Sequence, residues 1–311
     1  MKKALVLLTA ATALLAVTSC TKEGVYNPKE KIVKIYESSL NSTINSYGDQ
    51  TFTYSDTTAK HLTQEWNWDG NLLTSISCYN YNEQTKESVF SYKMDMTYDG
   101  KRLVKVASSS TEYATYTYED NKIAKIESYY NGELQLSSAI THDGKKIVKI
   151  VMTIYDDEIN DDLAKFALSS LMPSKRALDA VFAVRSDKAS AVATQTLDFT
   201  YDGNNVSKMV MTYGDETMTM EFTYDKNKNP FCGNYVLSAG EGDLNCINAN
   251  NVLTEKSTWQ RTGETYDPQE STYTYEYDGK YPVTKTMTQS SVDGDYYRST
   301  YTHTTYLEYA D

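Results

Sequence analysis

The residues that most often carry out chemistry are sparse in this sequence and form no known motif. Neither Gly-x-Ser-x-Gly nor His-Glu-x-x-His occurs, and no glycine-rich loop has the spacing of a phosphate cradle. Two pairs of adjacent carboxylates, Asp156-Asp157 and Asp161-Asp162, come nearest to a hydrolase or calcium site. A glycosidase needs two carboxylates across a cleft, and a calcium loop alternates its oxygen ligands around a glycine. Neither arrangement is indicated, so we expect solvated loop charges and no catalytic activity.

Histidine and cysteine are too scattered to indicate a metal centre. His61, His142 and His303 are far apart in the sequence, and no Cys-x-x-Cys occurs. His142 stands where other copies of a repeated phrase hold an aromatic residue, so we expect it to pack rather than to bind. The sequence therefore predicts no cofactor and no bound metal.

The first residues predict export and a lipid anchor. Lys2 and Lys3 precede a short apolar run over residues 4–17, and small residues follow it, which is typical of a secretory signal. The run is shorter than the roughly 20 residues that span a bilayer. Val17-Thr18-Ser19-Cys20 resembles the lipobox of bacterial lipoproteins, in which the cysteine thiol is acylated before cleavage. We expect a signal peptide at 1–19, a lipidated tether at 20–28, and attachment to the cell envelope at the outer membrane, on its periplasmic or surface face.

Net charge and cysteine content limit the partners further. The formal charge is -12 and no basic cluster is present, so the composition argues against nucleic acid as a partner. The membrane is an expected partner through the acyl chains on Cys20. Exported proteins meet oxidising conditions, and Cys232 with Cys246 would close a short loop. Whether this pair forms a disulfide is left open by the sequence, and Cys78 would then remain as a thiol.

One phrase recurs along the chain and predicts its architecture. An aromatic-x-aromatic-Asp-Gly segment, or a close variant, is followed by aliphatic-x-Lys-aliphatic residues. The copies end their aromatic segments at Trp68, Tyr98, Tyr118, His142, Tyr201, Tyr224 and Tyr277. Asp-Gly between alternating segments is a strong hairpin signal, because a type I′ turn needs two residues at positive φ. We therefore expect an all-β protein, a repeat-built antiparallel meander forming a long twisted or curled sheet, with a closed barrel as the alternative.

The aromatic residues of the repeat should lie on one face of this sheet, because residues i and i+2 of a strand share a face. The aliphatic residues after each turn occupy both odd and even positions and therefore both faces of the strand. This indicates that the second face of the sheet is only partly covered. The candidate binding face consists of Trp66, Trp68, Tyr98, Tyr116, Tyr118, Tyr201, Tyr224, Tyr275 and Tyr277. Tyrosine in place of phenylalanine is typical of a half-wet surface. The alternative is that cross-strand pairing or curling of the sheet buries these rings as ordinary core.

The repeat is interrupted between Asp143 and Asp202. A capping residue at Asn160 or Asp161 and apolar residues at helical spacing predict a small helical insertion at about 160–191. An insertion of this size is too small for a separate domain. We expect it to cover part of a sheet face or a sheet end, within one β-repeat domain at 29–311.

The repeats resemble the YD repeats of bacterial Rhs-type surface proteins, and more closely a family of uncharacterised bacteroidete lipoproteins with tyrosine-rich repeats. The residues that carry the closer resemblance are Tyr224-Asp225, Asn229-Pro230-Phe231, Asn250-Asn251-Val252, Tyr273 to Asp278, and Tyr281-Pro282. The resemblance covers nearly all of the mature chain and implies a β-rich lipoprotein of unknown function. It implies no catalytic residue.

The expected function is that of a non-catalytic envelope lipoprotein, a binding or scaffold module. A glycan held on the Tyr/Trp face is one expected partner, since stacked rings would form a strip for sugar units. The alternatives are a structural or adhesive module that contacts an envelope protein, or a barrel that holds a small apolar ligand.

Overall fold

The computed structural model describes residues 25–47, 50–155, 172–174, 176–178, 181, 193–234, 246–261, 264–265, 268–293 and 297–310. The predicted signal peptide, the lipidation site at Cys20, both carboxylate pairs and most of the insertion lie outside these residues.

The described chain is almost entirely β-strand. The first nine strands are β1 (Ile32–Tyr47), β2 (Gln50–Asp69), β3 (Leu72–Asn82), β4 (Glu87–Asp99), β5 (Arg102–Ala107), β6 (Tyr113–Glu119), β7 (Lys122–Tyr130), β8 (Glu133–Asp143) and β9 (Lys146–Ile154). The remaining strands are β10 (Ala193–Asp202), β11 (Asn205–Tyr213), β12 (Glu216–Lys228), β13 (Asn250–Arg261), β14 (Glu264–Thr265), β15 (Gln269–Asp278), β16 (Tyr281–Asp293) and β17 (Tyr297–Tyr309).

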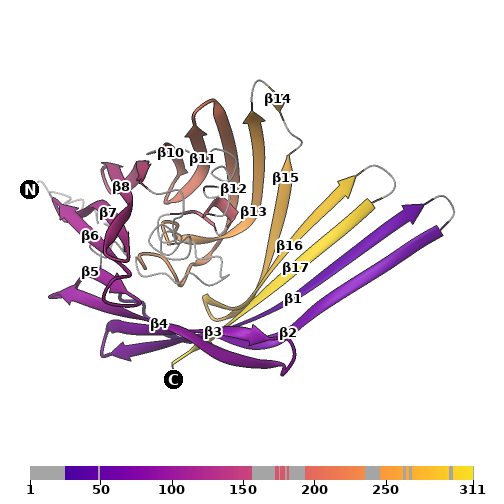
Figure 1. Cartoon of the computed structure of the whole chain (residues 1–311), viewed down its shortest axis with the longest axis horizontal. Helices are drawn as coiled ribbons and strands as arrows, with labels where there is room; N and C mark the ends of the chain where they lie inside the picture. Colours follow the sequence, from indigo (N-terminus) through magenta and orange to yellow (C-terminus); the bar gives the residue numbers. More distant parts are fainter. Residues whose placement is uncertain are drawn as a thin grey trace, which may run out of the picture.

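These strands form one antiparallel sheet that closes on itself. All 17 belong to the same sheet, and each long strand pairs with its neighbours in sequence. The two-residue β14 is a side branch, because β13 also pairs directly with β15. β1 pairs with β17 from Ile32↔Tyr309 to Asn45↔Tyr297, which joins the first strand to the last (Figure 1). The predicted meander is confirmed, and it takes the form of the alternative, a closed barrel.

The hairpins turn one residue later than the sequence suggests. In the β4–β5 hairpin Asp99 pairs with Arg102, so the two central residues are Gly100 and Lys101. Gly100 has φ +61 and Lys101 is not among the residues with positive φ. This pattern is that of a type II′ turn, which places glycine first, and the expectation of type I′ turns at Asp-Gly is wrong here. The same positive φ occurs at Gly70, Gly144, Gly203 and Gly279.

A β-bulge follows the turn and orients the aliphatic residues. The register of β4 against β5 shifts after the Tyr98↔Leu103 pair, which leaves Val104 as an extra residue. A bulge of this kind places two residues opposite one and alters the alternation of faces. Leu103 and Val106, three positions apart, are therefore both fully buried. The same shift recurs in the hairpins that contain Thr74, Ala124, Val148, Ser207 and Val283. The expected scatter of aliphatic residues over both faces is thus corrected.

The inner face of the barrel is covered by the chain itself. Residues 176–178 of the insertion are helical. The Arg176 guanidinium donates to the Ser257 and Ser271 hydroxyls, both at 2.9 Å, on the inner face of β13 and β15. Gln195 of β10 donates to the Val181 carbonyl at 3.1 Å. The described part of the insertion therefore covers a sheet face, as expected, and that face is the inner one (Figure 1).

The segment expected to be a tether also reaches into the barrel. Tyr26 is buried, and its ring lies 5.8 Å from that of Trp68. Its hydroxyl donates to the Pro230 carbonyl at 2.8 Å. Core packing therefore includes Tyr26, three residues before the boundary predicted at Lys29.

Four strands project beyond the rest of the barrel. In the described register, β2 pairs with β3 only from Gln64 to Asp69, and β15 pairs with β16 only as far as Gln289. Beyond these points β1, β2, β16 and β17 pair among themselves and extend away from the other strands (Figure 1). We call residues 39–58 and 289–301, apart from residues 48–49 and 294–296, the strand extension.

Candidate functional site

The repeat aromatics lie on the inner face of the barrel. Trp66 and Tyr116 are 3% and 4% exposed and belong to the core. The half-buried rings packed against that core are Trp68, Tyr98, Tyr118, Tyr201, Tyr224 and Tyr275. Tyr277 is half-buried and its hydroxyl donates to the Asp225 carboxylate. The nine residues of the predicted binding face thus line the core side of the sheet.

Most of these aromatics also make one particular hydrogen bond. The Tyr98 hydroxyl on β4 donates to the Leu73 carbonyl on β3 at 2.7 Å, and Leu73 is the residue just before the bulge at Thr74. The equivalent bonds are Trp68 to Ile32, Tyr118 to Leu103, Tyr201 to Ile147, Tyr224 to Val206, Tyr275 to Val252 and Tyr309 to Pro282. We call this set of seven bonds the aromatic ladder.

The aromatic ladder explains why the repeat contains tyrosine rather than phenylalanine. Every acceptor carbonyl belongs to the residue that precedes a bulge, where the pairing between strands is interrupted. A donor from the adjacent strand satisfies a polar backbone group at each of these points. His142 of β8 occupies the matching position in its own hairpin, consistent with the packing role expected for it. The sequence showed the rings and not their partners, because the partner is a backbone atom.

Three tyrosine hydroxyls of the ladder, those of Tyr98, Tyr224 and Tyr309, remain protonated at neutral pH. Burial raises the pKa of Tyr98 to about 12. Burial also raises the pKa of Tyr224 and Tyr309 further above the ordinary value of 10.0. A phenol with a raised pKa is a stable hydrogen-bond donor and a poor general base. The ladder is therefore built for structure.

The histidines do not converge on a common site. His61 on β2 stacks on the Tyr81 ring at 4.5 Å and its Nδ1 lies 2.9 Å from the Ala59 carbonyl. His303 on β17 is buried, with its Nε2 3.8 Å from a Glu37 carboxylate oxygen. In the described ranges, no group of three or more His, Cys, Asp or Glu side chains is placed to hold a metal ion.

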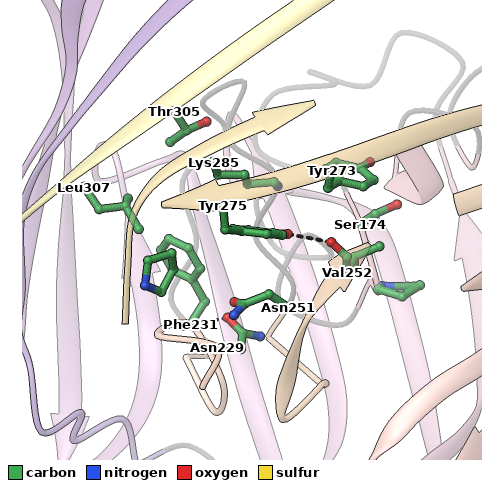
Figure 2. A pocket seen from close by; sticks show the side chains of 12 residues that line it. Ser174, Asn229, Phe231, Asn251, Val252, Tyr273, Tyr275, Lys285, Thr305 and Leu307 are labelled. Atoms are coloured by element: carbon green, nitrogen blue, oxygen red, sulfur yellow. Dashed lines mark hydrogen bonds between the residues drawn. The ribbon is translucent and has the colours of Figure 1, made fainter. Parts of the chain in front are cut away.

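A small cavity lies between Pro173, Ser174, Asn229 and Phe231 on one side and β13, β15, β16 and β17 on the other. Figure 2 shows Phe231 and Asn229 facing Tyr275, whose hydroxyl bonds to the Val252 carbonyl, with Lys285 above. The free volume is about 30 Å³. One water needs roughly 10–15 Å³, so the space suits two or three waters, whereas drug-sized ligands occupy roughly 300 Å³ or more.

The strand extension carries two strongly exposed aromatic rings on β2. Phe52 and Tyr54 are 55% and 61% exposed. Asn45 pairs with Phe52 and Thr43 pairs with Tyr54, and directly opposed residues of antiparallel strands share a face. Asn41 lies on this face too, two residues before Thr43.

This face is continuous with the lining of the barrel. The β1–β17 register runs without a shift from Lys34↔Glu308 to Asn45↔Tyr297, so residues of one parity stay on one side. Glu37 and His303 of that parity are buried inside the barrel, and the same side outward along the strands carries Asn41 and Thr43. We call Asn41, Thr43, Asn45, Phe52, Tyr54, Ser299 and Tyr301 the inward extension face. Sequence reasoning missed it, although Thr51-Phe52-Thr53-Tyr54 has aromatics at i and i+2 with no turn signal after them.

The opposite side of the extension is aliphatic and hydroxylic. Leu40 and Ile44 are both exposed, and they pair with Thr57 and Thr53 of β2. The two faces therefore differ in character: the inward one combines rings with amides, and the outward one combines aliphatic side chains with hydroxyls.

The remaining predicted site residues are the cysteines. Cys78, Cys232 and Cys246 are thiols in this structure, with Cys78 and Cys246 buried and Cys232 exposed. The backbone N–H of Gly233 donates to the Cys246 carbonyl at 2.8 Å, which places the two segments side by side. The disulfide between them stays a prediction.

Within the residues that the structure describes, no helix is long and apolar enough to cross a bilayer. A search of family models and of curated proteins finds no match to this chain.

Proposed function

We propose that this protein is a non-catalytic lipoprotein of the cell envelope that binds a glycan on the inward extension face. The acyl chains on Cys20 hold it at the membrane, and the filled barrel is the rigid support from which the strand extension projects. One observation carries the proposal: exposed Phe52 and Tyr54 rings lie beside the amides and hydroxyls of Asn41, Thr43 and Asn45.

The chemistry of this face fits a sugar. The apolar C–H face of a pyranose packs on an aromatic ring, and Tyr and Trp supply such rings with little entropy to lose. Amide and hydroxyl groups donate and accept at the same time, which suits the hydroxyls of a sugar. Asp56, opposite Asn41, adds a carboxylate acceptor. Regular strand pairing holds these groups in place, which lowers the ordering cost on binding.

Two other places in the barrel suit a ligand less well. The repeat aromatics face the core, and six of them donate to backbone carbonyls in the aromatic ladder. The cavity beside Phe231 has room for two or three waters. The proposed glycan site is therefore on the extension.

A glycan array probed with the mature chain tests the proposal. A double variant, Phe52→Ala with Tyr54→Ala, should weaken binding to the best glycan by tenfold or more, because each stacked ring contributes about 0.5–1.5 kcal/mol beyond its buried area. Phe90→Ala is the matched control, since Phe90 on β4 is 57% exposed and lies off the extension. No glycan bound by the wild type, or equal loss from the control, would reject the proposal.

Contact with an envelope protein is the competing outcome of the same experiment. Leu40 and Ile44 on the outward side are the residues that would support it. A Leu40→Ser, Ile44→Ser variant that loses capture of one defined envelope protein, with no glycan bound by the wild type, would replace the glycan proposal.

The lipid anchor is tested in cells of the source organism. Metabolic labelling with an alkyne fatty acid should mark the wild-type protein and leave Cys20→Ala unmarked and released from the membrane fraction. Label retained on Cys20→Ala would contradict the anchor without bearing on the glycan site.

A further inference from the structure

Two short segments between β12 and β13, residues 229–234 and 246–249, are joined inside the barrel by hydrogen bonds. The Asn229 N–H donates to the Ala249 carbonyl at 3.1 Å, and its side-chain amide donates to the Asn248 carbonyl at 2.9 Å. Further along, the Gly233 N–H donates to the Cys246 carbonyl at 2.8 Å. Residues 229–234 and 246–249 therefore lie against each other over most of their length.

This pairing limits the distance between Cys232 and Cys246. In standard peptide geometry, the Cys232 Cα lies about 2.4 Å from the Gly233 nitrogen, and the Cys246 Cα about 2.4 Å from its own oxygen. With the 2.8 Å hydrogen bond between those atoms, the two Cα atoms are at most about 7.6 Å apart. Disulfides span roughly 4.4–6.8 Å between Cα atoms, so the backbone already holds the pair at or near bonding range.

The Tyr26 hydroxyl is electrostatically coupled to both thiols. Burial raises its pKa, and the nearby negative charges that Cys246 and Cys232 would carry as thiolates raise it further. Tyr26 donates to Pro230, two residues before Cys232. The cysteines therefore sit directly beside the point where the N-terminal segment docks, six residues after the proposed lipid attachment at Cys20.

We propose that Cys232 and Cys246 form a disulfide that fastens residues 229–234, to which Tyr26 is bound through the Pro230 carbonyl. Exposed Cys232 reacts first: its thiolate attacks one sulfur of a small or protein disulfide, that bond breaks, and one thiol leaves. The buried Cys246, as thiolate, then attacks the Cys232 sulfur and releases the second thiol. In total two protein thiols are oxidised, and the donor disulfide accepts two electrons and two protons to become two thiols.

The bond would act on the link between anchor and barrel. Tyr26 is held by the Pro230 carbonyl, by the Trp68 ring and by the surrounding core. A closed loop of 15 residues, 232 to 246, reduces the freedom of the unfolded chain and lowers the unfolding equilibrium constant about a hundredfold. The N-terminal segment would then stay docked when the barrel opens locally. This inference is independent of any glycan site.

Peptide mapping of the full chain tests the bond. The protein is equilibrated with oxidised glutathione, free thiols are alkylated, and the digest is analysed by mass spectrometry. We expect a cross-linked peptide pair containing Cys232 and Cys246, two hydrogens lighter than the sum of the reduced pair. Cys78 should be alkylated only after unfolding, because it is buried on β3 and its pKa is raised to about 11 by burial. The oxidised protein should also unfold at a higher urea concentration than the reduced protein.

The controls separate the bond from general effects of oxidation. Cys78→Ser should keep the cross-link and the shift in urea midpoint, whereas Cys232→Ser should lose both. Glutathione that remains on Cys232 at equilibrium, with Cys246 alkylated after unfolding, would overturn the proposal. So would a cross-link that involves Cys78. The comparison of oxidised with reduced wild type needs no variant, so the test still decides the question if a variant folds poorly.

Discussion

Replacing Tyr118 with phenylalanine removes one hydroxyl from the aromatic ladder and leaves the ring in place. The lost bond runs from the Tyr118 hydroxyl to the Leu103 carbonyl at 2.7 Å in a half-buried position. A hydrogen bond of this kind contributes about 0.5–1.5 kcal/mol net, and an unsatisfied buried group costs about 1–3 kcal/mol. Since Tyr118 is half-buried, water can partly solvate the carbonyl left behind. We therefore expect the free energy of unfolding to fall by about 1 kcal/mol.

Urea unfolding followed by tryptophan fluorescence measures this loss, because Trp66 and Trp68 lie in the core region. Tyr54→Phe is the matched control: the same hydroxyl is removed from a ring that is 61% exposed on the strand extension, and the expected change is below about 0.5 kcal/mol. The structural account of the ladder would be refuted if the urea midpoint of Tyr118→Phe equalled that of the wild type, or was no lower than that of Tyr54→Phe. A shift confined to Tyr118→Phe would support it.

The turns, the buried phenols and the buried ion pair can be tested in the same unfolding assay. Gly100→Ala should destabilise the protein by about 1–2 kcal/mol. The cost is conformational, because φ is +61 and no atom lies near the added Cβ. Lys101→Ala in the same turn is the control and should change the free energy of unfolding little. The free energy of unfolding should fall as pH rises from about 10 to about 12, because the pKa of Tyr98 is raised from 10.0 to about 12 in the folded state. The stability that the buried neutral phenol contributes is complete below the unfolded pKa and is lost above the folded pKa. A constant free energy of unfolding across this pH range would contradict the prediction. Arg176→Ala should lower the free energy of unfolding by about 3 kcal/mol, because it leaves the fully buried Glu255, 3.8 Å from the guanidinium, without its cation. Glu255→Gln added to Arg176→Ala should recover part of this loss. A double-mutant cycle that shows no coupling between the two residues would reject the pairing.

The hairpins, the strand order and the common face of the aromatics follow from local sequence. Alternating segments around glycine predict an antiparallel meander, and residues i and i+2 such as Tyr116 and Tyr118 share a face whatever the sheet does next. The bulges were not predictable in the same way. An aliphatic pair at i and i+3, such as Leu103 and Val106, fits two arrangements. In a regular strand the two side chains lie on opposite faces of the sheet, and in a bulged strand they lie on the same face. Only the register of the neighbouring strand distinguishes these.

Closure and site position depend on contacts between distant residues. Nothing near Ile35 indicates that its partner is Leu307, and without closure the aromatic rows have no defined inside. The sequence predicts a binding face in the repeat, where rings are most frequent, although their frequency there reflects the aromatic ladder. Phe52 and Tyr54 belong to no repeat and lie on strands longer than the hairpin unit. Their exposure depends on where β3 stops pairing with β2.

The seam between β1 and β17 bears on the order in which the chain can fold during synthesis. Tyr36 and Glu308, which meet across it, are 272 positions apart, whereas the other main strand pairs are neighbours in sequence. The hairpins can therefore form as the ribosome releases them, while β1 keeps an open hydrogen-bonding edge until the final strand emerges. Such an edge can pair with another nascent chain. Loss of β17 would therefore leave two complementary open edges, and we expect a chain ending before Tyr297 to form linear polymers rather than a destabilised monomer.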